Sequence, residues 1–106
     1  MPVGHMTATI ATDALRDCLG EGGTVRPSRH FLEELTAEGL TIPDAWHVLK
    51  RGIIIDPPEL DIKTGEWKYR IEGNEPEGKG VGIIFCFKQV NYALLITVFA
   101  LEGGSR

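Results

Sequence analysis

The chain has 106 residues, of which 42% are hydrophobic and 25% are charged, as is usual for one globular domain with a single core. Fifteen acidic and eleven basic side chains give a net charge of −4. Proteins that coat nucleic acid through broad electrostatic attraction are basic, so this class is disfavoured, while a local basic patch remains open.

Neither a metal ion nor a cofactor is expected from the sequence. Cys18 and Cys86 stand far apart, which predicts neither a thiol-rich metal site nor a disulfide framework. The amino terminus lacks the basic stretch and apolar run of a signal peptide, and the longest apolar run, 93–101, is too short to span a bilayer. We therefore expect a cytoplasmic protein with no membrane partner.

Three helices are predicted in the first half of the chain. Apolar residues at three- and four-residue spacing predict a helix over 7–19. Ser28 is the expected N-cap of a second helix that runs to about Glu38. Thr41 is expected to cap a third helix, which Gly52 ends.

Strands are predicted after Gly52, where the apolar period changes. The expected order is a short strand over 53–55 that Asp56-Pro57-Pro58 stops, a loop over 56–65, and then strands over 66–72, 81–87 and 92–101. Residues 25–26 are expected to be extended because Pro27 disfavours helical geometry before it. The predicted fold is α+β, with N-terminal helices packed on one face of a C-terminal antiparallel sheet.

Lys68 and Arg70 are the most informative pair of residues. On a strand, residues at i and i+2 point to the same face, so both cations face away from Tyr69 and the other apolar residues of that strand. If helices cover the apolar face, the cations stand on the open face, where they can hold a phosphate or stabilise a developing oxyanion. The alternative is a solvated strand face on which Glu72 is their partner.

His30 is the second candidate, because it lies in the first turn of the predicted helix that Ser28 caps. The positive end of a helix favours the neutral imidazole, which can act as a general base. The alternative is a structural histidine that hydrogen-bonds a loop carbonyl.

Aromatic residues are interpreted as core rather than as a platform for stacking bases, because they alternate with the buried positions: Trp46, Trp67, Phe85, Phe87 and Phe99. The predicted strand over 81–87 is apolar on both faces. Such a strand is covered on both faces, by other parts of the chain or by a partner, and a homodimer would supply one.

The order of the motifs is more specific than any single motif. Arg26-Pro27-Ser28-Arg29-His30 opens a helix, the run Gly39 to Gly52 follows, then Trp67 to Gly73, and Leu95 to Phe99 closes the pattern. Over residues 24–101, this order resembles the bacterial family catalogued as domain of unknown function 4258. The single domain would then consist of an N-terminal segment with the first helix, 1–23, and a toxin-like α+β region, 24–106.

The resemblance implies a relation to the RelE-like and MqsR-like ribonuclease toxins, which cleave mRNA without a metal ion by attack of a ribose 2′-hydroxyl on the adjacent phosphate. Their partners are small antitoxin proteins. His30, Arg70 and Thr97 match recurring polar positions of the family, and Lys68 is a local match. We assign His30, Arg70 and Lys68 to catalysis, and Thr97 and Lys88 to substrate binding.

The predicted function is therefore that of a toxin-like, metal-independent endoribonuclease with an antitoxin protein and mRNA as partners. The alternative is a non-catalytic protein-binding module on the same fold, to which the strand with two apolar faces points.

Overall fold

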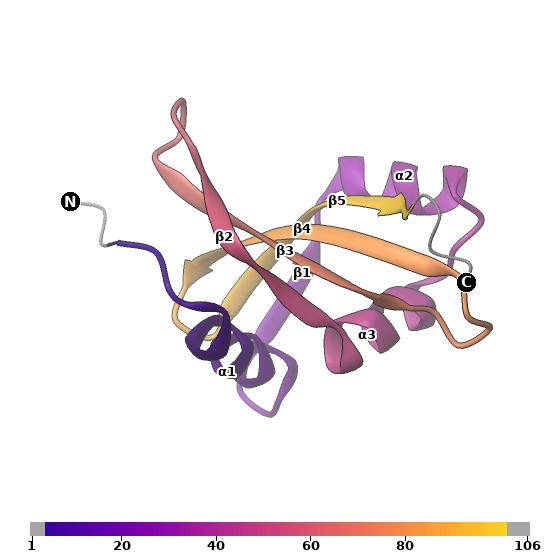
Figure 1. The fold of residues 1–106 in the computed structure, drawn as a ribbon, viewed down its shortest axis with the longest axis horizontal. Helices are drawn as coiled ribbons and strands as arrows, with labels where there is room; N and C mark the ends of the chain where they lie inside the picture. The colour runs from indigo at the N-terminus through magenta and orange to yellow at the C-terminus, as the bar shows by residue number, and fades with distance from the viewer. Residues whose placement is uncertain (1–3, 102–106) are drawn as a thin grey trace.

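The computed structural model describes residues 4–101, in which three helices pack against one five-stranded sheet (Figure 1). The elements in chain order are α1 (Ala8–Leu19), β1 (Thr24–Pro27), α2 (Arg29–Ala37), α3 (Ile42–Arg51), β2 (Ile53–Asp61), β3 (Glu66–Asn74), β4 (Gly80–Gln89) and β5 (Tyr92–Ala100). The predicted α+β architecture is confirmed, with helices first and most of the sheet after them.

The antiparallel sheet predicted over 53–101 is confirmed, and the additional strand β1 makes the whole sheet mixed. The strand order is β1-β5-β4-β3-β2, and all neighbours are antiparallel except β1, which runs parallel to β5. Thr24 to Pro27 pair with Tyr92 to Leu95. The residues before Pro27 are thus extended, as expected, but they also form an edge strand that the sequence pattern did not predict.

Local signals set the helix boundaries as predicted. The Ser28 hydroxyl accepts a hydrogen bond from the backbone N–H of Phe31 at the start of α2. Thr41 and Asp44 form a reciprocal capping box at the start of α3, each side chain accepting from the other's backbone N–H. After α2, Gly39 adopts a φ of 72°, a backbone conformation that glycine reaches without steric cost.

All three helices bury their apolar sides in one core against the same face of the sheet. The buried side chains include Leu15 of α1, Phe31 of α2 and Val48 of α3, together with Ile71 of β3 and Ile83 of β4. In Figure 1, α1 and α3 lie below the sheet, while α2 runs beside β5 at the upper right. The opposite face of the sheet carries Lys68 and Arg70, and none of the helices within residues 4–101 lies across it.

The expected stop at Asp56-Pro57-Pro58 is wrong, because β2 continues through these residues to Asp61. The register of β2 against β3 shifts between Ile55 and Glu59. Two facts explain the tolerance for proline: β2 is an edge strand, and the prolines fall in the irregularity where the ladder is interrupted.

A second irregularity re-aims the end of β5. The register against β4 shifts between Ile84 and Phe85, so Thr97 pairs with Ile84 while Leu95 pairs with Phe85, and Ile96 is left between them. This bulge turns Thr97 and Phe99 to the open face. The interpretation of Phe99 as core is therefore wrong, and its ring is half-buried on the open face.

Candidate functional site

The open face holds a groove of about 200 Å³ between β2, β3 and β4. Its lining residues are Ile55, Pro57 and Glu59 of β2, Lys68 and Arg70 of β3, and Ile84 of β4. Arg70 pairs with Ile55 and Lys68 with Glu59 in the sheet register, and the irregularity of β2 between those two pairs shapes this wall. The structure therefore brings together the two cations that alternation placed on one face.

Each cation of the groove has a carboxylate beside it. Lys68 Nζ lies 2.9 Å from Asp61 Oδ2, and Arg70 Nε and Nη2 each lie 2.6 Å from Glu72 Oε2. The hydrogen bond from Lys68 lowers the pKa of the Asp61 carboxyl, and the same bond raises the pKa of Lys68. Lys68 and Asp61 are therefore both charged at neutral pH.

The charge pairs leave donors available in the groove. A guanidinium has five N–H donors, and Arg70 directs two of its nitrogens at one oxygen of Glu72. The Lys68 ammonium has three N–H donors and only the Asp61 contact to serve among the described residues. The four side chains of these pairs are 20–46% exposed, so both pairs are open to solvent on one side. Ion pairs at a protein surface contribute only about 0–1 kcal/mol, so an incoming phosphate can share or displace these carboxylates.

Arg70 is held in place from a second direction. Its guanidinium carbon lies 5.0 Å from the centre of the Phe99 ring, a stacking distance for a cation on an aromatic face. The ring of Phe99 lies over Gly82, its register partner on β4, and a Cβ on Gly82 would lie 2.5 Å from Phe99 Cζ. Glycine at this position is therefore what lets Phe99 lie across β4 and reach Arg70 on β3.

His30 lies elsewhere, at the edge of β5, and does not line the groove. Its Nε2 is 3.1 Å from Glu34 Oε2, one helical turn further along α2. Glu34 Oε1 in turn accepts a hydrogen bond of 3.1 Å from the backbone N–H of Val98. This N–H is exposed to α2 because β1 pairs with β5 only as far as Leu95.

The contact with Glu34 fixes how the neutral imidazole of His30 is protonated. A carboxylate oxygen only accepts, so the Nε2 atom facing it carries the hydrogen, and Nδ1 keeps the lone pair of a base. The side chain of His30 is 63% exposed, so Nδ1 is accessible to a ligand. A carboxylate that orients a histidine is the arrangement used in hydrolytic triads.

The two residues assigned to substrate binding, Thr97 and Lys88, lie in different parts of the sheet. Thr97 lies in one row with Arg70, because both pair with Ile84 across the sheet. Strands are spaced about 4.8 Å apart, which puts the backbones of Arg70 and Thr97 roughly 10 Å apart. Lys88 is at the far end of β4, where its ammonium pairs with the carboxylate of Glu66.

Sequence reasoning missed several residues of the site. The spacing of His30 and Glu34, i and i+4 on a helix, is a signal that could have identified the second residue. Asp61 and Phe99 reach the cations through strand register and a bulge, for which the sequence carries no comparable signal.

No family model matches the chain, and no curated protein or solved structure matches it either. Within residues 4–101, His, Cys, Asp and Glu side chains nowhere gather in a group of three or more that could hold a metal ion. None of the helices in that range is long and apolar enough to cross a membrane.

Proposed function

We propose that the protein is a toxin-like endoribonuclease with a RelE-related fold, which cleaves mRNA without a metal ion and is held inactive by an antitoxin protein. The observation that carries the proposal is the groove in which Lys68 and Arg70 stand together on the open face. The order of motifs that resembles domain of unknown function 4258 supports it.

The reaction joins the ribose 2′-oxygen to the adjacent phosphorus and breaks the bond from phosphorus to the 5′-oxygen. It needs a clamp for the phosphate, a base for the 2′-hydroxyl proton and an acid for the leaving oxygen. Arg70 is the clamp, because its free N–H groups can grip two phosphate oxygens while Phe99 and Glu72 hold the guanidinium. Lys68 assists from the same groove.

His30 serves as base or acid from the edge of β5, and a water molecule takes the other of these two roles. An RNA strand lying across the open face along the row of Arg70, Ile84 and Thr97 leads from the groove toward that edge. Thr97 lies on this path and can donate its hydroxyl to a phosphate or ribose oxygen. The carboxylate of Glu34 leaves Nδ1 of His30 free to take the proton of the 2′-hydroxyl.

The chemistry of the cleaved ends tests this proposal. Purified protein is incubated with a mixture of RNA sequences in the presence of a chelator, and the new ends are analysed by mass spectrometry. We expect fragments with a 2′,3′-cyclic phosphate and a 5′-hydroxyl, because the attacking group is the neighbouring 2′-oxygen. Fragments with a 5′-phosphate, or cleavage that stops on chelation, would contradict the mechanism.

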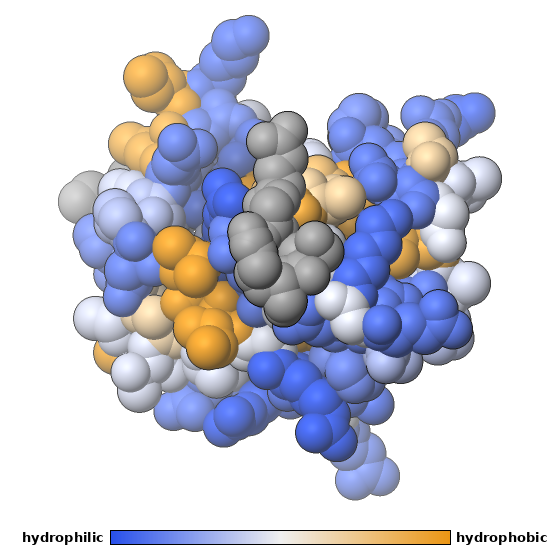
Figure 2. Space-filling model, turned by 45° about the vertical axis from the view of Figure 1, so that its right-hand side comes forward, coloured by the Kyte–Doolittle hydropathy of each residue, from blue (hydrophilic) through white to orange (hydrophobic). Residues whose placement is uncertain are grey.

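A non-catalytic protein-binding module is the second candidate, and the surface of β2 favours it. Ile53 is 71% exposed and Ile62, in the turn after β2, is 91% exposed. Figure 2 shows apolar surface in separate patches among hydrophilic residues. One patch is at the upper left, where the β2–β3 hairpin projects. If this were the main function, substitution of Ile53 by lysine would abolish partner binding and Arg70→Ala would change nothing.

A further inference from the structure

The sheet splits into two halves at one end. The ladder between β3 and β4 runs from the pair Asn74–Gly80 to the pair Tyr69–Phe85 and stops there. Beyond it, residues 66–68 of β3 stay paired with β2, and Phe87 of β4 stays paired with β5. Figure 1 shows the two hairpins, β2–β3 and β4–β5, diverging toward the left of the view.

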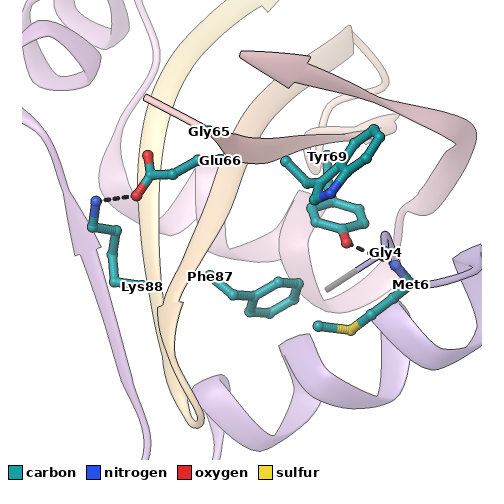
Figure 3. A pocket seen from close by; sticks show the side chains of 8 residues that line it. Gly4, Met6, Gly65, Glu66, Tyr69, Phe87 and Lys88 are labelled. Carbon is teal, nitrogen blue, oxygen red and sulfur yellow. Dashed lines mark hydrogen bonds and ion pairs between the residues drawn. The ribbon is translucent and has the colours of Figure 1, made fainter. Parts of the chain in front are cut away.

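A cavity of about 310 Å³ lies in this split, and it is the size of a site for a small ligand. Aromatic side chains of Trp67, Tyr69 and Phe87 form one wall, with Met6 beside them. Trp67 and Phe87 pack partly buried against the core, as expected, and line the cavity as well, while the His5 ring makes an edge contact with Trp67. The Tyr69 hydroxyl accepts a hydrogen bond of 2.9 Å from the backbone N–H of Met6, so the segment before α1 closes one side (Figure 3).

The other wall of the cavity is charged. The carboxylate of Glu66 and the ammonium of Lys88 form an ion pair on the side away from the aromatic rings (Figure 3). Glu66 and Lys68 are two residues apart on β3, so both side chains stand on the open face of the strand. The charged wall of the cavity therefore adjoins the groove in which Lys68 and Arg70 stand.

We propose that this cavity is a nucleobase subsite, and that guanine is the base it selects. A base presents flat faces that stack on aromatic side chains such as Trp67 and Phe87. The Watson–Crick edge of guanine carries two neighbouring N–H donors. The Glu66 carboxylate can accept both once Lys88 leaves Oε2 and the 3.8 Å contact from Cys86 Sγ leaves Oε1. Lys88 then supplies a cation for the phosphate of that nucleotide.

The inference rests on the proposed function, because the endoribonuclease supplies the RNA that brings a base to the split. It adds what the groove alone lacks. Cations bind phosphate without regard to sequence, so Lys68 and Arg70 cannot choose a cleavage position. A base held at the end of β3 would fix which phosphate reaches Arg70.

Binding of mononucleotides tests the subsite independently of cleavage. The protein is used with Trp46→Phe, so that its fluorescence comes from Trp67. It is titrated with guanosine 5′-monophosphate, uridine 5′-monophosphate and inorganic phosphate. We expect the guanine nucleotide to change the fluorescence and to bind about 10-fold tighter than the uracil nucleotide, because uracil offers the carboxylate one N–H donor beside a carbonyl.

Two variants separate recognition from folding. Glu66→Gln replaces the carboxylate and should bring guanine binding down to the level of uracil, while Glu33→Gln, an exposed carboxylate of α2, should leave both unchanged. If Glu66→Gln does not fold, Phe87→Leu tests the aromatic wall and should weaken both nucleotides. Equal binding of both nucleotides and of phosphate alone would overturn the proposal.

The outcomes also distinguish this proposal from the proposed function. Guanine-selective binding without any RNA cleavage would support the subsite and contradict the proposed endoribonuclease function. Cleavage with no preference at guanine, and no effect of nucleotides on the fluorescence of Trp67, would support the endoribonuclease function and contradict the subsite.

The unpaired strand edges could instead accept a strand of a protein partner. Protection of residues 66–68 and 86–88 from hydrogen exchange by such a partner, with no nucleotide binding, would overturn the proposal.

Discussion

Replacing Gly52 with alanine tests the packing that holds β3, and with it Lys68 and Arg70, in place. Gly52 ends α3 and enters β2 with an extended backbone, φ −77° and ψ 179°, which alanine can adopt. Its surroundings leave no room for a side chain. A Cβ would lie 2.7 Å from the carbonyl oxygens of Glu72 and Val48 and 2.9 Å from Cγ1 of Ile71.

The clash is with backbone atoms that cannot turn aside. The Val48 oxygen accepts the Gly52 N–H at 2.7 Å, and Glu72 pairs with Ile53 in the β2–β3 ladder. Overpacking of this kind destabilises the folded state by about 1–3 kcal/mol. Alanine also lowers the conformational entropy of the unfolded chain, which stabilises the fold by about 0.4–1 kcal/mol. We expect a net loss of about 1.3 kcal/mol, which lowers the melting temperature of a domain of this size by roughly 5–10 °C.

Gly20 provides the matched control, because it ends α1 with a similar extended backbone, φ −91° and ψ −171°. The nearest atom to a Cβ there is the carbonyl oxygen of Arg16 at 3.4 Å, an ordinary contact. Gly20→Ala should therefore be neutral or stabilise by about 0.5 kcal/mol. Both variants are compared by thermal and urea unfolding. If they prove equally stable, the close contact of α3 with β3 is wrong.

Three further predictions concern titratable groups. Glu34→Ala removes the acceptor that holds Nε2–H of His30, and the ¹⁵N shifts of the ring should then report a mixture of tautomers in place of one; unchanged shifts would contradict the dyad. The Lys68 contact lowers the pKa of Asp61, so its stabilisation is complete above the ordinary pKa and is lost as pH falls through the folded-state value. Unfolding measured between pH 5 and about pH 2 should therefore show a smaller acid-induced loss of stability in Asp61→Asn than in the natural chain, and equal losses would refute the pairing. Burial raises the pKa of the Cys86 thiol to about 11, so a disulfide reagent at pH 8 should label it only after unfolding, and rapid labelling of the folded chain would contradict its burial.

Helix boundaries were predictable because short-range chemistry sets them. Ser28 and Thr41 cap the helices that follow them, and the change of apolar period at Gly52 marks the start of the sheet. β1 was missed because a strand over Thr24–Pro27 gains its partner only from β5, at the other end of the chain. Nothing local distinguishes such a strand from an extended connection.

In the candidate site, too, only the features set by local sequence were predictable. Alternation along β3 correctly placed Lys68 and Arg70 on one face. Their contacts depend on register between strands: Asp61 reaches Lys68 across the β2–β3 hairpin, and Phe99 reaches Arg70 only because of the bulge in β5. The sequence also led us to expect His30 and Arg70 at the rim of one polar cleft on the open side of the sheet. Arg70 lines the groove and His30 does not, so their action on one phosphate stays a prediction.

The rate of RNA cleavage by Arg70→Ala tests the central claim most directly. Arg29→Ala, which removes an exposed arginine of α2, is the control. With chelator present, we predict that the natural chain and Arg29→Ala cleave the same RNA at similar rates, and that Arg70→Ala is slower by about 10²-fold or more, because it loses a charge-assisted contact to the reacting phosphate. An Arg70→Ala variant that folds and cleaves at the full rate would contradict the assignment of the groove as the catalytic site.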